Sequence, residues 1–469
     1  MYRSFSASLA FACAAPLGAL AQSPAEIQAL REEIGAIRSA YEARLQALEQ
    51  RLQLAQQATN AGPPLPTPAA PLALALPAAA APAPVASPVA AASGNPNAFN
   101  PAISLILSGL YSRSAQDPAN YAISGFATPV GAGVGPGTRG LSLAESELGL
   151  SASIDPWLRG AASIALHPDD SVSVEEAFVQ TTALGNGLSL KAGRFLSGVG
   201  YLNAQHAHAW DFVDNPLVYQ ALLGTQYGDD GLQLQWLAPT DQYLELGAEL
   251  GRGRGFPASA TGRNGAGMTA LTLHTGGDIG ASHNWRAGIS LLNARATDQG
   301  LDAVNAAGTR VINAFSGSTR VWVLDGVWKW APNGNATHSS FKLQGEYLRS
   351  SSSGSLAYDL DNGATMDSYR ATQSGWYLQG VYQFMPRWRL GLRTDRLDPG
   401  MSDYGINAAA MTGSGYRPAR NTLMLDFNPS EFSRLRLQLA RDRAREGHSD
   451  NQLFLQYQMS LGAHGAHRY

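Results

Sequence analysis

The chain of 469 residues has a single cysteine, Cys13, and few charged residues, 15% of the total. One cysteine excludes a disulfide framework. A formal net charge of −3 indicates neither a nucleic-acid-binding surface nor a disordered acidic chain. Beyond the first 21 residues, no run of about 20 uninterrupted apolar residues offers a membrane-spanning helix. What is abundant is glycine, 50 residues, together with short stretches of apolar–polar alternation, and both are typical of β proteins.

The first hundred residues predict three successive segments. Residues 1–21 read as a signal peptide, because Arg3 precedes an apolar stretch that ends at Ala19-Leu20-Ala21. Residues 22–58 predict a periplasmic coiled-coil helix, since the apolar residues from Ile27 onward follow 3-4 spacing. A single amphipathic helix lying on a partner surface is the alternative. Residues 59–100 form an Ala/Pro-rich linker in which seven prolines between 66 and 88 exclude a helix. We expect the helix to join protomers into a homotrimer or to engage peptidoglycan.

Residues 101–469 predict an all-β fold, an antiparallel transmembrane β-barrel in the outer membrane. In its clearest stretch Leu435 and Leu437 alternate with Arg434 and Arg436, the period of a strand. The apolar series is expected to face lipid and the polar series a wet lumen. The predicted strands are 103–112, 143–154, 157–167, 171–182, 188–195, 226–238, 242–252, 266–276, 284–296, 319–331, 338–350, 374–385, 387–397, 419–428, 432–442 and 450–461.

The connectors between these stretches support a count of about sixteen strands. Bacterial barrels place short turns in the periplasm and long loops outside, with an even number of strands. Sixteen strands imply an aqueous channel, whereas eight leave a lumen filled by side chains. The tight connectors are 155–156, 184–187, 239–241, 332–337, 386 and 429–431, and the long ones are 113–142, 196–225, 297–318, 351–373 and 398–418.

Charged residues on the polar series are the candidate pore-lining residues. Acids dominate the early strands and bases the late ones. In a closed barrel the two groups either face each other and set up a transverse field across the pore, or pair with opposite charges on neighbouring strands. A one-residue error in register would reverse any of these assignments. The predicted pore-lining residues are Glu145, Glu147, Arg159, Lys191, Glu245, Glu249, Arg286, Arg389, Arg393, Arg434 and Arg436.

The third outer connector, residues 196–225, is the richest in polar and aromatic side chains. If it folds into the barrel, it forms the constriction. His206 and His208 with Asp211 or Asp214 are candidate ligands of Zn²⁺, because imidazole and carboxylate are its usual donors. The two histidines are equally well placed to hydrogen-bond carboxylates of the barrel wall.

Several long strings resemble a family of zinc-regulated bacterial outer-membrane proteins. They are AGRFLSGVGYLNAQHAHAWDFVDNPLVYQALLG, GDDGLQLQWLAPT, LELGAELGRGRGFP and GGDIGASHNWRAGIS. The family is porin-like and related in outline to phosphate-selective porins. The resemblance covers essentially the whole barrel and implies passage of metal ions when zinc is scarce. Some relatives are labelled TonB-dependent receptors, but such receptors have twenty-two strands and a plug domain, which this chain does not match.

The sequence therefore predicts a porin-like channel for passive passage of small hydrophilic solutes or ions, with zinc as one candidate. A TonB-dependent-type zinc receptor without a standard plug, and a surface receptor or adhesin, are the alternatives. We expect no enzyme and no resident cofactor apart from transported or bound Zn²⁺, since the histidines belong to no nucleophile motif. The candidate histidines considered outside the third connector are His167, His274, His283, His338 and His448.

Overall fold

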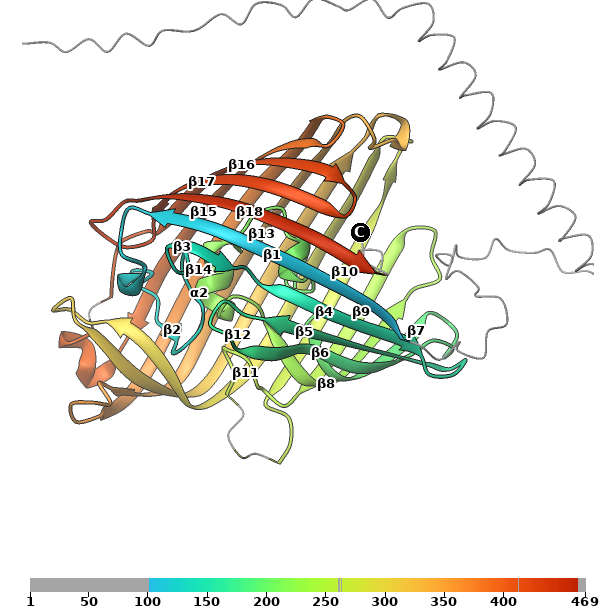
Figure 1. Cartoon of the computed structure of the whole chain (residues 1–469). Coiled ribbons are helices and arrows are strands. Elements are labelled where there is room, and N and C mark those ends of the chain that lie inside the picture. Colours follow the sequence, from blue (N-terminus) through green and yellow to red (C-terminus); the bar gives the residue numbers. More distant parts are fainter. Residues whose placement is uncertain (1–100, 260–261, 263, 412, 463–469) are drawn as a thin grey trace, which may run out of the picture. The chain divides into compact units, whose positions relative to one another are not determined.

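The computed structural model describes residues 101–259, 262, 264–411 and 413–462 (Figure 1). The predicted signal peptide, coiled coil and linker lie outside the described residues, as does the C-terminal tail from residue 463. Among the described residues, no helix has the length and hydropathy that crossing a membrane requires.

Within the described residues, sixteen strands of eight residues or more form one antiparallel sheet that closes on itself. Each strand pairs with the next along the chain, and β18 pairs back with β1. The predicted sixteen-stranded barrel is therefore confirmed. The strands are β1 (Ala102–Ser114), β4 (Ser146–Ser153), β5 (Leu158–Leu166), β6 (Val172–Thr181), β7 (Leu188–Leu196), β8 (Gly228–Leu237), β9 (Tyr243–Gly251), β10 (Met268–Ile279), β11 (His283–Val304), β12 (Arg310–Trp330), β13 (Ser340–Tyr358), β14 (Thr365–Met385), β15 (Trp388–Asp403), β16 (Ala419–Ser430), β17 (Ser433–Arg443) and β18 (Asp450–Gly462).

Smaller elements lie in the connectors. Two short strands occupy the segment between β1 and β4, and the helices among the described residues are one or two turns long. These elements are β2 (Thr128–Pro129), β3 (Gly140–Leu143), the 3-10 helices η1 (Pro118–Asn120), η2 (Ala207–Ala209), η3 (Pro332–Gly334) and η4 (Gly405–Ala409), and the α-helix α2 (Leu217–Leu223).

The alternation of apolar and polar residues in the sequence corresponds to the outer and inner faces of the barrel wall. On β17, Leu435 and Leu437 are 40% and 39% exposed on the outer surface, whereas Arg436 and Gln438 are 1% and 0% exposed. An apolar outer surface over polar inner residues suits strands that stand between lipid and a wet lumen. Phe454, the exception to alternation on β18, is 2% exposed and faces inward.

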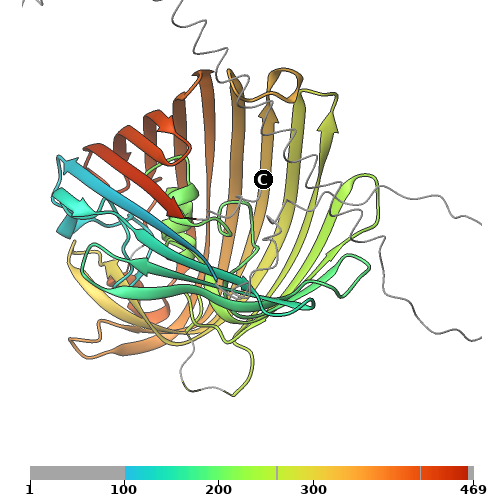
Figure 2. The ribbon, with the colours of Figure 1, turned by 45° about the vertical axis from the view of Figure 1, so that its right-hand side comes forward.

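The wall of the barrel is uneven in height. Strands β4 to β9 have 8 to 10 residues, whereas β11 to β15 have 16 to 22, and Figure 2 shows the yellow and orange strands standing well beyond the green ones. The predicted long loops 297–318 and 351–373 are therefore wrong, because most of their residues extend two hairpins. Serine-rich stretches such as 350–353 carry short polar residues on both faces, which hides the period of two.

Candidate functional site

The segment that joins β7 to β8, residues 197–227 and hereafter loop 3, folds into the barrel. Its helix α2 packs against β13, β14 and β15, and all seven of its residues are buried. Gly224 ends the helix with φ of 62°, a left-handed conformation that glycine adopts without a steric cost. Loop 3 therefore occupies the lumen, as the constriction hypothesis requires (Figure 1).

Carboxylates of the wall hold the backbone of loop 3. Glu346 on β13 accepts hydrogen bonds from the amides of Tyr201 at 3.1 Å and Leu202 at 2.9 Å and from the hydroxyl of Tyr219 at 2.8 Å. Glu249 on β9 accepts from the amide of Gly198 at 2.8 Å. These bonds satisfy buried polar groups of the loop that would otherwise be costly to bury, so the contacts fix the path of the loop.

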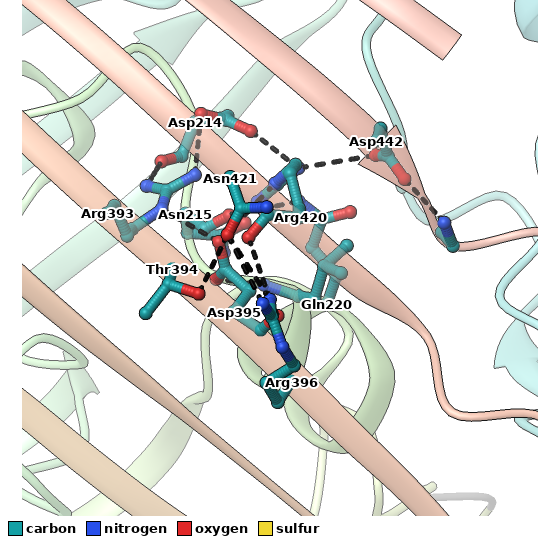
Figure 3. Close-up of polar contacts among 12 residues, drawn as sticks. Asp214, Asn215, Gln220, Arg393, Thr394, Asp395, Arg396, Arg420, Asn421 and Asp442 are labelled. Carbon is teal, nitrogen blue, oxygen red and sulfur yellow. Dashed lines mark hydrogen bonds and ion pairs between the residues drawn. The ribbon is translucent and has the colours of Figure 1, made fainter. Parts of the chain in front are cut away.

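The second half of loop 3 is anchored to basic residues of β15 and β16 (Figure 3). Asp214 lies 2.9 Å from Arg393 Nη2 and 2.7 Å from Arg420 Nη1, and Arg420 also donates to the carbonyl of Asn215 at 2.7 Å. Burial opposes ionisation of Asp214, but Arg420 and Arg393 outweigh it and hold the pKa of that carboxyl below its usual range. Asp214 is thus an ionised clamp on the basic wall.

Asp211 makes the same kind of contact closer to the inner end of the barrel. It pairs with Lys342 and lies 3.4 Å from Arg389. Burial acts against its charge, but these two cations keep the pKa of Asp211 well below its usual range. Arg389 also pairs with Asp426, which lies 2.8 Å from Arg436. Arg389 and Arg436 therefore share one carboxylate of the wall, and the first of them also contacts loop 3.

The first half of loop 3 turns toward the opposite, acidic wall formed by β4 to β6. His206 lies 3.0 Å from both Glu175 and Glu176, through Nδ1 and Nε2 respectively. His208 Nδ1 lies 2.8 Å from Glu147. Burial disfavours a charged His206, but the hydrogen bonds to Glu175 and Glu176 prevail and raise the pKa of that imidazole well above its usual value. This is the second of the two sequence interpretations, in which the histidines bond barrel carboxylates.

A β-bulge brings two consecutive acids into this cluster. The register of β5 against β6 shifts between Ser163 and Ile164, which leaves Glu175 without a partner on β5. Both Glu175 and Glu176 then turn inward, as their contacts with His206 show. A bulge re-aims a side chain in this way. Sequence reasoning missed Glu175, because strict alternation sends one of two adjacent residues to the lipid.

The four residues predicted to share a zinc ion are therefore separated. His206 and His208 lie at the acidic wall, whereas Asp211 and Asp214 lie at the basic wall, so the two aspartates do not join the histidines. The two charge groups of the wall stand apart, and within the basic one opposite charges on neighbouring strands pair with each other. The transverse field remains a prediction. Loop 3 bridges the two charge groups with charges of the opposite sign on each side, which sequence reasoning did not foresee.

The remaining predicted pore-lining residues have contacts inside the barrel. Glu145 lies beside Glu175, and Glu245 lies 3.5 Å from His274. Arg434 donates to the carbonyls of His208 and Trp210 at 3.4 Å. The other three contacts are Arg159 with Gln180 at 2.6 Å, Lys191 over the ring of Phe178 at 4.4 Å, and Arg286 over the ring of Tyr201 at 5.2 Å.

Below loop 3, the inner half of the lumen is a cavity of about 980 Å³, hereafter the inner vestibule. Residues 280–284 and 331–340, near the inner turns, line its open end, and Tyr201, His206 and Asp211 of loop 3 line its floor. Its charged lining consists of Arg159, Lys191, Lys329, Lys342, Arg389 and Arg434 against Glu176, Asp211 and Asp278. Six cations therefore meet three carboxylates in this space.

Residues 115–139, hereafter loop 1, cross the outer mouth of the barrel. The chain leaves β1, and its strand β2 pairs with Leu301 and Asp302 of β11, the ninth strand of the ring when β1 is the first. Arg310 donates to the carbonyl of Tyr121 at 2.9 Å. The chain then returns through β3, which pairs with β1.

Loop 1 and loop 3 also pack against each other. Ile123 and Phe126 of loop 1 belong to the same buried apolar cluster as Leu217 and Leu222 of α2. Two loops thus occupy the outer half of the lumen and pack against each other there.

Comparisons with known proteins bear on this fold. No protein-family model matches the chain. Among solved structures, the chain is similar to a loop-deletion mutant of the Vibrio cholerae outer-membrane protein OmpT (12% identity, 78% of this chain, 100% of that chain, TM-score 0.49). It is also similar to the anion-selective porin of Comamonas acidovorans (12%, 77%, 99%, 0.47) and the channel DcaP of Acinetobacter baumannii (12%, 78%, 99%, 0.45). These TM-scores and sequence identities are too low to support a conclusion about function.

A sequence relative gives a stronger result. An Aquifex aeolicus (strain VF5) protein described as "Uncharacterized protein" is 32% identical over 348 residues, which cover 71% of this chain and 70% of the relative. Sequence identity of this extent over most of both chains shows that the two proteins are homologous. The chain therefore belongs to the same family as that Aquifex aeolicus protein.

Proposed function

We propose that the protein is a porin-like channel of the outer membrane through which small hydrophilic solutes or ions pass passively. The observation that carries this proposal is the inner vestibule, a charged cavity of about 980 Å³ inside a closed sixteen-stranded wall. A barrel that serves only as an anchor needs no such space, because its lumen can be filled by side chains. The passage runs from the vestibule past loop 3 and under loop 1.

The charge of the vestibule favours anionic solutes. Its lining has six cations against three carboxylates. Two of the cations, Lys329 and Lys342, face each other directly across β12 and β13. Like charges in that position destabilise a sheet, and Asp211 of loop 3 offsets part of the repulsion by pairing with Lys342. A cleft lined by one sign of charge raises the local concentration of the opposite ion.

Lys329 provides a test of this preference. A unit charge about 8 Å from a permeating ion in water contributes about 0.5 kcal/mol, or about a twofold change in partitioning. We expect K329Q to lower the chloride-to-potassium permeability ratio by about that factor, measured as the reversal potential across a bilayer under a KCl gradient. The matched control is R370Q, which removes one positive charge from an exposed outer position. An unchanged reversal potential in K329Q would refute the role of the vestibule charge.

Passage of zinc is the second candidate. The cluster of His206, Glu147 and Glu175 at the acidic wall favours it, whereas the cationic vestibule opposes entry of a divalent cation. A reversal potential measured under a ZnCl₂ gradient distinguishes the two: zinc passage requires a shift toward the zinc equilibrium potential, and its absence leaves anions as the permeant species.

The partners of the channel are also proposed. The apolar outer surface suits outer-membrane lipid. A homotrimer formed through the barrel and the coiled coil, and attachment to peptidoglycan, rest on the sequence pattern of residues 22–58. The proposal that the chain is exported rests on the sequence pattern of residues 1–21. Sixteen strands fit a channel better than a TonB-dependent receptor of twenty-two, and a barrel that acts only as an adhesin needs no such vestibule.

A further inference from the structure

The acidic wall brings together a set of metal-binding side chains from three separate parts of the chain. Ligand atoms of Glu147 on β4, Glu175 on β6 and His206 in loop 3 all lie within 4.8 Å of one another. Glu176 and His208 adjoin them, at 3.0 Å from His206 and 2.8 Å from Glu147 respectively. This spacing allows one ion to contact all three side chains with small rotations of the side chains.

The wall is built to concentrate negative charge at this place. Because of the bulge at Glu175, two adjacent carboxylates enter the lumen where regular pairing admits one. Glu145 and Glu147 add two more from the neighbouring part of the chain. Close carboxylates repel one another unless a cation lies between them. His206 offsets part of this charge when it is protonated, and a divalent cation that displaces its proton would offset more.

The burial of the cluster supports the same conclusion. Glu147 is 8% exposed, and its Oε2 atom lies 2.8 Å from His208 Nδ1 and 3.4 Å from His206 Nδ1. Its other oxygen accepts a hydrogen bond from Ser163, which leaves Oε2 directed at the two imidazoles. Taking a carboxylate out of water is costly unless positive charge lies beside it, and a divalent cation among these ligand atoms would supply that charge.

We propose that Glu147, Glu175 and His206 form a binding site for a divalent cation that takes mixed nitrogen and oxygen ligands, such as Zn²⁺, and that the bound ion fastens loop 3 to the acidic wall. Mixed imidazole and carboxylate ligands suit zinc, whereas calcium and magnesium prefer oxygen alone. The ion reaches the site through the inner vestibule, which Glu176, His206 and His208 line. The effect on passage rests on the proposed channel function, but the binding itself does not.

Isothermal titration of the full-length mature protein, folded in detergent without an affinity tag and treated with a chelator, tests the site. We expect one ZnCl₂ site per chain and at least about tenfold weaker binding of MgCl₂. E175Q and H206A should each weaken zinc binding by at least the 10- to 100-fold that is typical of changes around a metal centre. The control is H283A, a histidine that lines the same vestibule outside the cluster.

Hydrogen exchange gives a second readout that does not depend on conductance. Zinc should slow amide exchange across residues 200–212 of the wild type and leave exchange in E175Q unchanged. The proposal is overturned if the wild type binds no zinc, or if E175Q and H206A bind it as tightly as the wild type does. If the protein binds zinc with these properties but conducts no current, the metal site is supported and the proposed channel function is refuted.

Discussion

Replacing Asp214 by alanine is expected to detach loop 3 from the basic wall. The substitution leaves Arg393 and Arg420 buried without the carboxylate that lies within 2.9 Å of each. Removing one partner of a buried ion pair costs about 3–5 kcal/mol, and the lower end applies here because Asp395 remains 3.2 Å from Arg393 and 3.6 Å from Arg420. That cost shifts the docking equilibrium of the loop by a factor of at least about 100.

Two measurements follow the detached loop. Where opening is fast, proteolysis tracks the population of the open form, so cleavage within residues 197–227 should accelerate by about 100-fold in D214A. Single-channel conductance should rise, because the detached loop no longer narrows the lumen. D361A, an exposed aspartate in an outer turn, makes the same chemical change as a control. Wild-type protease resistance and conductance in D214A would show that other contacts, such as those of Glu346, hold the loop alone.

A disulfide between loop 1 and β11 is expected to close the channel. Pro129 and Leu301 are register partners across β2 and β11, and the amide of Val130 donates to the carbonyl of Gly300 in the adjacent pair. The 129–301 pair is thus the non-hydrogen-bonded one, whose Cα atoms stand about 4.5 Å apart, within the range of a disulfide.

Oxidised P129C/L301C should carry only a small fraction of the current of its reduced form, and a thiol reductant should restore it. The physical reason is that loop 1 crosses the outer mouth, so that passage requires its displacement. Cys13 lies in the predicted signal peptide, so the mature chain offers no competing thiol, and the two single variants serve as controls. Equal currents from the oxidised and reduced protein would mean that solutes pass without moving loop 1.

The barrel was predictable from the sequence because lipid imposes a period of two on each strand. Leu435, Arg436 and Leu437 alternate for that reason, and all sixteen predicted strands have a counterpart in the structure. The outer ends of β11 to β15 could not be predicted in this way, because short polar residues on both faces of the hairpins remove the alternation there. Strand bounds therefore failed where the chain leaves the predicted membrane layer.

The candidate site was predictable only in part. Residue types identified loop 3 and its histidines, and alternation placed Glu147 and Arg393 on the inner face. The bulge at Glu175 leaves no local trace in the sequence, because it depends on how β5 pairs with β6. The separation of Asp211 from His206 could not be predicted either, because the four residues between them, 207–210, cross from one wall to the other.

The central claim is that this barrel conducts, and the current through purified full-length mature protein in a planar lipid bilayer tests it most directly. We predict stepwise, ohmic conductance increments, with larger steps in D214A than in the wild type. A bilayer that stays silent with the wild type, with D214A and with reduced P129C/L301C, although each is shown to be folded, would contradict the account.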